Sequence, residues 1–245
     1  TKDIILGLYY LTMMREGEKG EGMVFGSVGE IDQALSAGVL SLHAPIKARF
    51  HGVDDAGKPV KQIVETTAGR MILSDLLPRN PHIKFDLINC LITSKDVTSL
   101  VDMVYRHCGQ KETVIFADRL MALGFKYATS SGISFGKDDL LIPAEKESLV
   151  ASTHEMVGNY EQQYLDGLIT RGEKYNKVVD AWSQCSENVA QAMMKGLSRA
   201  VPGQDVNSVY MMAHSGARGS AAQMKQLAGM RGLMTKPSGE IIETP

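Results

Sequence analysis

The sequence lacks the short motifs that mark many nucleotide-binding and hydrolytic sites. It contains no P-loop, no G-x-G-x-x-G and no nucleophile elbow, and its 6 histidines include no H-x-x-x-H pair. It also has no D-x-D cluster of carboxylates that could hold Mg²⁺. These absences argue against a stand-alone nucleotide-binding enzyme. We expect no catalytic residue, no metal ligand and no bound cofactor within this chain.

Cysteine, one-sided charge and long apolar runs are also sparse. The 3 cysteines, Cys90, Cys108 and Cys185, lie far apart without a C-x-x-C pair, which predicts reduced thiols in a cytoplasmic protein. Cys108 and Cys185 fall at apolar helix positions and are expected in the core. No run approaches the roughly 18 apolar residues of a membrane span, so we expect no membrane contact. The net charge of −2 shows no general basic bias, so any phosphate contact must be local.

The composition is that of an ordinary globular chain, with 44% apolar and 22% charged residues. The patterns described below predict the α+β class: mainly helical, with a small β-hairpin region in the N-terminal part and a long helical hairpin in the C-terminal part. Glycine and proline become rare after Pro143, so we expect one domain at 1–143 and another at 144–245. Both chain ends lie beside apolar segments, and we expect an excised segment of a longer polypeptide.

Several helices are expected in the N-terminal part. Ile4–Met14 is apolar nearly all round, which favours a buried helix, although a buried strand also fits so short a run. A capping box at Ser27–Glu30 opens a second helix. Ser94 is expected to cap a helix that ends at Gly109, and a further helix is expected over 113–127.

A β-hairpin is expected between these helices. Ile46–His51 alternates apolar and polar residues, as a half-buried strand does, and Val60–Thr67 can return as its partner. The residues between them, 54–59, are typical of a turn. Asp54 and Asp55 are adjacent there and could suggest a metal site, but such a pair is more often a solvated turn.

Two long helices are expected after Pro143, joined by a short glycine-containing turn. Helical spacing runs from Leu149 to Tyr164, and a capping box at Thr170–Glu173 opens the second helix. An apolar stripe on the second helix favours a packed core over a ligand site. Its members are Tyr175, Val178, Val179, Trp182, Cys185, Val189, Met193 and Leu197.

The opposite face of the second helix carries polar and charged residues near the tip of the hairpin, among them Asn176, Lys177 and Asp180. Such a cluster is usually a solvated face. A projecting tip is also a place where partner proteins dock, so both interpretations stay open from the residues alone.

A glycine-rich stretch near the end of the chain presents one arginine. Arg218 lies between Gly216 and Gly219, which can adopt positive φ and allow close approach of the backbone to a ligand. The capping box Ser220-x-x-Gln223 then opens a helix, so Arg218 should precede a helix N-terminus that favours anions. This arrangement can offer a guanidinium to a phosphate or a carboxylate. The alternative is a tight loop whose arginine pairs with a neighbouring carboxylate.

Several motifs, spread along nearly the whole chain, resemble segments of the β′ subunit of bacterial multisubunit RNA polymerase. They follow one another in the same order as in that family. The most specific is Tyr210–Gly219, YMMAHSGARG, followed by Gln226–Met234, QLAGMRGLM. The others are Asp3–Thr12, Gly20–Met23, Thr66–Arg70, Gly124–Ala128, Ser131–Ser134 and Gly172–Val178.

The resemblance implies that residues 1–143 form the pore domain and 144–245 the funnel domain. Together these would line the secondary channel, through which nucleoside triphosphates reach the active centre during DNA-templated RNA synthesis. The Mg²⁺-binding motif, the zinc-binding cysteines and the bridge helix would belong to other parts of the full subunit. The implied partners are the rest of β′, the α, β, ω and sigma subunits, template DNA and RNA.

The resemblance also implies roles for individual residues. Arg218 would contact the triphosphate of the incoming nucleotide, and Arg231 and Lys236 would belong to a loop that supports the bridge helix. Asn176, Lys177 and Asp180 would lie where Gre-type and DksA-type factors and the alarmone ppGpp act. His214 departs from the family, which usually has aspartate there, and could add a titratable positive charge.

A second hypothesis is that the chain is not part of a polymerase. In it, the chain is an independent helical adaptor that binds acidic partners through the tip of its hairpin. The matched motifs and their order argue against this alternative.

Overall fold

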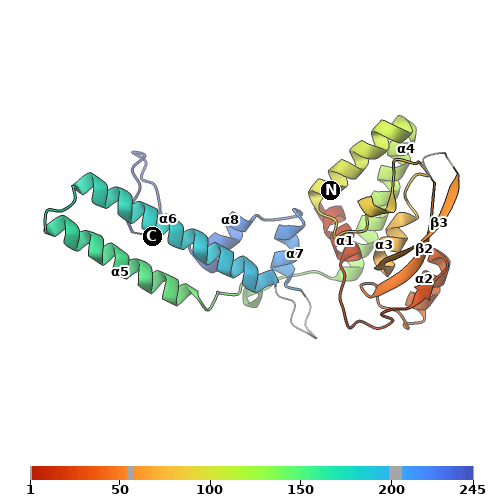
Figure 1. The fold of residues 1–245 in the computed structure, drawn as a ribbon, viewed down its shortest axis with the longest axis horizontal. Coiled ribbons are helices and arrows are strands. Elements are labelled where there is room, and N and C mark those ends of the chain that lie inside the picture. Colours follow the sequence, from red (N-terminus) through yellow and green to blue (C-terminus); the bar gives the residue numbers. More distant parts are fainter. Residues whose placement is uncertain (1, 54–57, 199–205, 245) are drawn as a thin grey trace. The chain divides into compact units, whose positions relative to one another are not determined.

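The computed structural model describes residues 2–53, 58–198 and 206–244. They form two compact units, whose helices and strands are labelled in Figure 1. The first unit comprises residues 1–133 together with 215–218, and the second comprises 134–214 and 219–245. The fold is α+β and mainly helical, as the sequence predicts. The assignment of pore and funnel roles to 1–143 and 144–245 stays a prediction.

The first unit combines helices with a small sheet. Its elements are α1 (Lys2–Thr12), β1 (Val24–Phe25), α2 (Val28–Ser36), β2 (Pro45–Val53), β3 (Pro59–Thr67), α3 (Ala68–Ser74), the 3₁₀ helix η1 (Phe85–Leu87) and α4 (Ser94–Ser131). The second unit is helical. Its elements are the 3₁₀ helix η2 (Lys137–Asp139), α5 (Lys146–Leu165), α6 (Arg171–Ser198), α7 (Ser208–His214), α8 (Ala221–Met224) and the π-helix η3 (Lys225–Gly229).

Helix α1 packs against α4 at the centre of the first unit. The expectation of a buried helix at Ile4–Met14 is confirmed, since Leu8 and Leu11 are fully buried. Gly7 of α1 and Gly124 of α4 are in direct contact, because neither has a side chain that would separate the two backbones. The two helices can therefore approach more closely than any other residue pair would permit.

Helix α4 differs from its expected form. Its N-cap is Thr93 rather than Ser94, because the Asp96 carboxylate accepts hydrogen bonds from the Thr93 amide at 2.8 Å and the Thr93 hydroxyl at 2.7 Å. Gly109 breaks the helix, as predicted, through a non-helical conformation with φ 80° and ψ 176°. The second segment then continues to Ser131, beyond the expected end near residue 127, and stops at a left-handed Gly132.

The sheet has the strand order β1-β2-β3. Strands β2 and β3 form the predicted antiparallel hairpin, paired without interruption from Pro45↔Thr67 to Val53↔Pro59. Strand β1 runs parallel to β2 and pairs only at Lys47 and Ala48. Asp54 and Asp55 lie outside the described residues.

A buried arginine joins three segments of the first unit. Thr67 caps α3 by accepting from the Arg70 amide at 3.3 Å. The Arg70 guanidinium donates to the carbonyl of Thr12 at 3.0 Å and to the Asn89 carbonyl and side-chain oxygens at 3.4 and 3.3 Å. Burial lowers the pKa of Arg70 from its usual value. The cation is thus solvated by carbonyl groups in place of water.

Helices α5 and α6 form the predicted hairpin of the second unit (Figure 1). The capping box at its turn is present: the Glu173 carboxylate accepts from the Thr170 amide at 2.9 Å, and the Glu173 amide donates to the Thr170 hydroxyl at 3.3 Å. The first of these bonds lowers the pKa of Glu173. Most of the apolar stripe on α6 is buried, including Trp182 and Cys185, so it is core as expected. In the part of the chain that the structure describes, no helix is long and apolar enough to span a membrane.

The three cysteines have different surroundings. Cys185 is buried, as expected, and its Sγ lies 3.7 Å from the Leu149 carbonyl oxygen. Cys108 is half-buried and packs at the margin of the first unit's core, while Cys90 is exposed. All three are free thiols in the structure.

Substituting alanine for Gly7 or Gly124 tests the contact between α1 and α4. A Cβ on Gly7 would lie 1.9 Å from the Gly124 carbonyl oxygen, and one on Gly124 would lie 2.9 Å from both the Cα and the carbonyl oxygen of Ile4. Overpacking usually costs about 1–3 kcal/mol, and backbone atoms cannot move aside as side chains do. We therefore expect each variant to lose at least about 3 kcal/mol of unfolding free energy, measured by chemical denaturation.

Gly29→Ala is the matched control in the same unit. Gly29 also lies in a helix, but the nearest atom to a Cβ added there would be the Ser27 hydroxyl oxygen at 4.0 Å. This variant should be neutral or slightly stabilising, since alanine favours helix. Equal losses for all three variants would contradict the proposed role of the close contact.

Candidate functional site

The arginine loop, residues 215–218, has the predicted backbone form. Gly216 and Gly219 have φ of 74° and 80°, the left-handed conformation that glycine adopts without strain. Ser215 is fully buried, and its hydroxyl accepts from the Ala217 amide at 3.2 Å. Arg218 is exposed, and among residues 2–53, 58–198 and 206–244 its guanidinium has no hydrogen bond or ion pair. The alternative of a locally paired arginine is therefore not observed in this described part.

The arginine loop is held against the rest of the first unit by hydrogen bonds to its backbone carbonyls. The Ser94 amide, at the N-terminus of α4, donates to the Ser215 carbonyl at 2.9 Å. The Lys2 ammonium donates to the Gly216 carbonyl at 3.2 Å. The first amides of a helix have no partner within the helix, so the loop supplies one of the acceptors that α4 requires.

The position of Ser94 is itself fixed by α1. Thr12, the last residue of α1, is fully buried, and its hydroxyl donates to the Leu8 carbonyl at 2.8 Å. The same oxygen accepts from the Ile92 amide at 3.0 Å, two residues before Ser94. Both ends of α1 thus contribute to holding the arginine loop, through Lys2 and through Thr12.

The helix expected after Arg218 is shorter than its capping box suggested. Ser220 caps it, accepting from the Gln223 amide at 3.3 Å, but α8 has only 4 residues before the π-helix η3 begins. The macrodipole of so short a helix is small. The main positive charge at this loop is therefore the Arg218 guanidinium, and the helix end adds little to it.

The predicted docking residues of the helical hairpin are all exposed on α6. Lys177 and Asp180 line a groove of about 410 Å³ between α5 and α6, together with Met156 and Tyr160. The Lys177 ammonium lies 5.5 Å from the centre of the Tyr160 ring. Asn176 is exposed outside this groove.

Arg231 and Lys236 are both exposed. Lys236 pairs with Glu240 at 2.8 Å across a small turn, which raises the pKa of Lys236. This turn is held to α6 by Tyr175, whose hydroxyl donates to the Ile241 carbonyl and accepts from the Ile241 amide, both at 3.1 Å. Sequence reasoning placed Tyr175 in the apolar stripe and missed this contact, because the partner is a backbone group without a sequence signal.

His214 stacks on another aromatic residue of α7. Its ring lies 5.1 Å from that of Tyr210, with 17° between the two planes. Burial raises the pKa of Tyr210. The stacking gives His214 a packing role in α7 that an aspartate could not supply.

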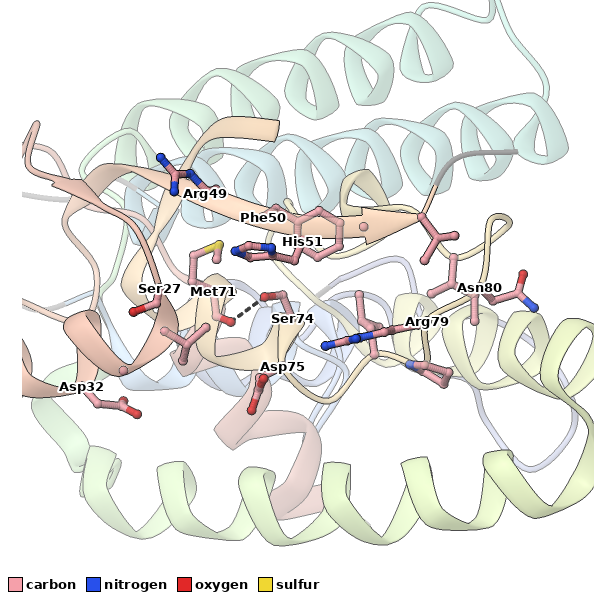
Figure 2. Close-up of a pocket in the computed structure, with 17 residues that line it drawn as sticks. Ser27, Asp32, Arg49, Phe50, His51, Met71, Ser74, Asp75, Arg79 and Asn80 are labelled. Carbon is pink, nitrogen blue, oxygen red and sulfur yellow. Dashed lines mark hydrogen bonds between the residues drawn. The ribbon is translucent and has the colours of Figure 1, made fainter. Parts of the chain in front are cut away.

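Sequence reasoning also missed a cleft in the first unit, of about 450 Å³ (Figure 2). Strand β2 lines one side with Arg49, Phe50 and His51, and Ser74, Asp75 and Arg79 lie across from it. The lining residues come from α2, β2, α3 and the segment after α3, so only the fold brings them together.

The described residues contain no group of three or more histidine, cysteine, aspartate or glutamate side chains that could hold a metal ion. Comparison with protein families identifies two matching domains. Residues 1–140 match RNA polymerase Rpb1 domain 3, and residues 169–244 match RNA polymerase Rpb1 domain 4. The chain belongs to the RNA polymerase Rpb1 family. This family is the largest, catalytic subunit of DNA-directed RNA polymerase, so the predicted resemblance is confirmed at that level.

Membership of the Rpb1 family sets the context of the site. The largest subunit works as a nucleotidyltransferase and assembles with the other polymerase subunits. Within this chain, the arginine loop is shared between the segments that match domains 3 and 4: Ser94 and Lys2 belong to the first, and residues 215–218 to the second.

Substituting alanine for Gly216 should loosen the arginine loop. The new Cβ would lie 3.1 Å from the Ser94 Cβ, in addition to the strain of a φ of 74°. Gly219→Ala is the control, because its φ of 80° gives similar strain while the nearest atom would be 4.0 Å away. We expect Gly216→Ala to speed hydrogen exchange of the Ser94 amide at least tenfold, and Gly219→Ala to change it less than threefold. Similar acceleration in both would show that backbone strain alone moves the loop.

Proposed function

We propose that this chain is the part of a bacterial β′ subunit that lines the secondary channel of RNA polymerase. In this proposal, residues 1–143 act as pore domain and 144–245 as funnel domain. The observation that carries the proposal is Arg218, an exposed arginine without an ionic partner among the described residues, on a loop fixed by Ser94 and Lys2. A fixed cation beside a route for nucleotides would bind the triphosphate and orient it for transfer.

The chemistry of Arg218 suits this role. Its guanidinium can donate two parallel hydrogen bonds to phosphate oxygens. The loop backbone is held in place before any ligand arrives, so little conformational entropy would be lost there on binding. A salt bridge within the protein would have to be broken first, and none is present at Arg218 in the described residues.

The chain would supply neither the catalytic metal nor the zinc site in this proposal. Both Mg²⁺ and Zn²⁺ would bind to other parts of the largest subunit. The neighbours of this chain would be the rest of β′, the α, β, ω and sigma subunits, the template DNA and the RNA product.

The helical hairpin would receive channel-binding factors of the Gre and DksA type. Asn176, Lys177 and Asp180 support this proposal because they are exposed, and two of them lie at a groove with apolar and polar walls. Contacts of this kind combine charge complementarity with burial of apolar surface. The groove is also where ppGpp bound with such a factor would find the Lys177 ammonium.

The loop with Arg231 and Lys236 would support the bridge helix. The contact between Tyr175 and Ile241 favours this role, because it fixes the end of this loop on the long helix α6. The alternative of an independent adaptor protein has no comparable support, since both matched segments belong to the same polymerase subunit.

Arg218→Ala in the reconstituted polymerase tests the nucleotide contact. Hydrogen bonds to charged groups contribute about 1.5–3 kcal/mol, so we expect the apparent affinity for nucleoside triphosphate to fall roughly 10- to 100-fold. The apparent affinity of Arg218→Lys should lie between those of the wild type and of Arg218→Ala, because lysine keeps the charge but loses the planar pair of donors. The measurement is single-nucleotide addition as a function of triphosphate concentration.

Arg119→Ala is the control for loss of an exposed arginine elsewhere on the chain. It should leave the triphosphate requirement unchanged. If Arg218→Ala assembles normally and its kinetics match those of the wild type, the arginine loop is a structural part of the channel and not a substrate contact.

Charge reversal on α6 tests the docking of factors. Lys177→Glu should weaken binding of a Gre-type or DksA-type factor to the polymerase at least tenfold, because it places repulsion at a complementary contact. Lys195→Glu makes the same charge change on the same helix outside the groove, and should have little effect. Factor titration monitored by fluorescence anisotropy gives both affinities. Equal affinities for both variants would argue against docking at the groove.

A further inference from the structure

The cleft shown in Figure 2 runs along an unpaired length of strand edge. Strand β3 pairs with β2 over its full length, Pro45–Val53, whereas β1 pairs with it only at Lys47 and Ala48. Beyond Ala48, among the residues that the structure describes, β2 continues without a strand on its β1 side.

The hydrogen-bonding groups of this edge face the cleft. The Lys47 amide donates to the Met23 carbonyl at 2.9 Å, so Lys47 directs its backbone toward the β1 side. Backbone groups of successive residues in an antiparallel ladder point to alternate edges, and the β2–β3 register has no bulge. His51, four residues after Lys47, therefore directs its amide and carbonyl to the same side, where no strand of the described chain accepts them.

The lining residues show that the cleft lies at the edge of β2 and not against one face of the sheet. Five consecutive residues of β2, 49–53, line it, although successive side chains point to opposite faces. No residue of β3 contributes. The other walls come from the start of α2, the end of α3 and residues 77–80. The volume of about 450 Å³ is within the usual range for ligand sites.

The charges around the cleft are of both signs. Arg49 and Arg79 are exposed, and neither guanidinium has an ion pair among the described residues. Asp32 and Asp75 are exposed carboxylates on the helical walls. A polyanion such as nucleic acid would be repelled by these two carboxylates, whereas a peptide can present an acidic and a basic side chain together.

The two open edges of the sheet are unequal. The outer edge of β3 carries Pro59 and Lys61, residue types that discourage pairing with another strand. The open part of β2 contains Gly52 and Phe50 and no proline. It is also bordered by residues of α2, α3 and the segment after α3.

We propose that an extended segment of another polymerase subunit adds a strand to β2 at His51. Its backbone would pair with the free amide and carbonyl of His51, as in other cases of strand addition. Its side chains would include a carboxylate facing Arg79 and a cation facing Asp75. The proposal does not depend on the roles assigned to Arg218 or to the helical hairpin.

Hydrogen exchange of single amides in the assembled polymerase gives the first test. His51 and Lys61 are opposite each other in the register, and the Lys61 amide faces the outer edge of β3. In the complete enzyme we expect the His51 amide to exchange at least tenfold more slowly than the Lys61 amide. Exchange of His51 as fast as that of Lys61 would overturn the proposal.

Matched proline variants give a second test. His51→Pro and Lys61→Pro each remove an amide that faces away from the β2–β3 ladder, which proline tolerates at a strand edge. We expect His51→Pro to weaken association of the partner subunit at least tenfold. Lys61→Pro and His51→Ala should leave that affinity within twofold of the wild type. Equal effects of both proline variants, or none from His51→Pro, would overturn the proposal.

A photo-crosslinking amino acid can identify the segment that lies in the cleft while strands β2 and β3 keep their wild-type sequence. With p-benzoylphenylalanine in place of Pro78, which lines the cleft beside Arg79 and has no assigned contact, irradiation of the assembled polymerase should link this chain to a second subunit. The same amino acid in place of Lys61 should not give that product. Crosslinks only within the largest subunit, or only to nucleic acid, would overturn the proposal.

Discussion

The direct contact between Gly7 and Gly124 is the constraint on which the first unit depends. It sets the distance between α1 and α4 without any side chain between them. Gly69 makes a similar close backbone contact on a second side of α1, since a Cβ there would lie 1.9 Å from the Leu11 carbonyl oxygen. Helix α1 is thus enclosed by backbone on two sides. Hydrophobic burial supplies the driving force for this arrangement, but the missing side chains determine its geometry.

The position of α1 helps to determine the position of the arginine loop. The two hydrogen bonds that involve Lys2 and Ser94 reach residues 215 and 216, which are more than a hundred residues away in the sequence. A shift of α1 along α4 would displace both at once. The exposed guanidinium of Arg218 therefore lies at the end of a series of contacts that begins where α1 and α4 meet at Gly7 and Gly124.

Local signals in the sequence predicted much of the fold. The N-cap at Ser27, the capping box at Thr170 and the β-hairpin are all present, because each depends on residues close together in the chain. The Ser27 box is only half formed, since the Glu30 carboxylate accepts from the Gly26 amide and not from that of Ser27. Errors arose where two local signals competed, as at the start of α4, where Thr93 with Asp96 forms the cap and Ser94 does not. A threonine and a serine side by side give nearly equal signals, and only the position of the acidic residue separates them.

The candidate sites also divide into those that local sequence predicted and those that only the tertiary fold brings together. Glycines on both sides of Arg218 correctly indicated a left-handed, exposed loop, and the charge pattern of α6 indicated the exposed face of the hairpin. The cleft beside β2 could not be predicted, because its walls come from four segments whose proximity is a property of the tertiary fold. The family resemblance could not supply the partner of Tyr175 either, since a backbone carbonyl and amide leave no mark in the sequence.

The buried guanidinium of Arg70 has a consequence for the conditions under which the first unit holds together. Its acceptors are the carbonyl oxygens of Thr12 and Asn89 and the side-chain amide oxygen of Asn89. None of these groups titrates, so acid cannot remove the acceptor as it would protonate the carboxylate of a salt bridge. Burial also shields the contact from dissolved ions. The link between the end of α1, α3 and the segment that leads to α4 is therefore indifferent to both acidity and ionic strength over the range in which cells live.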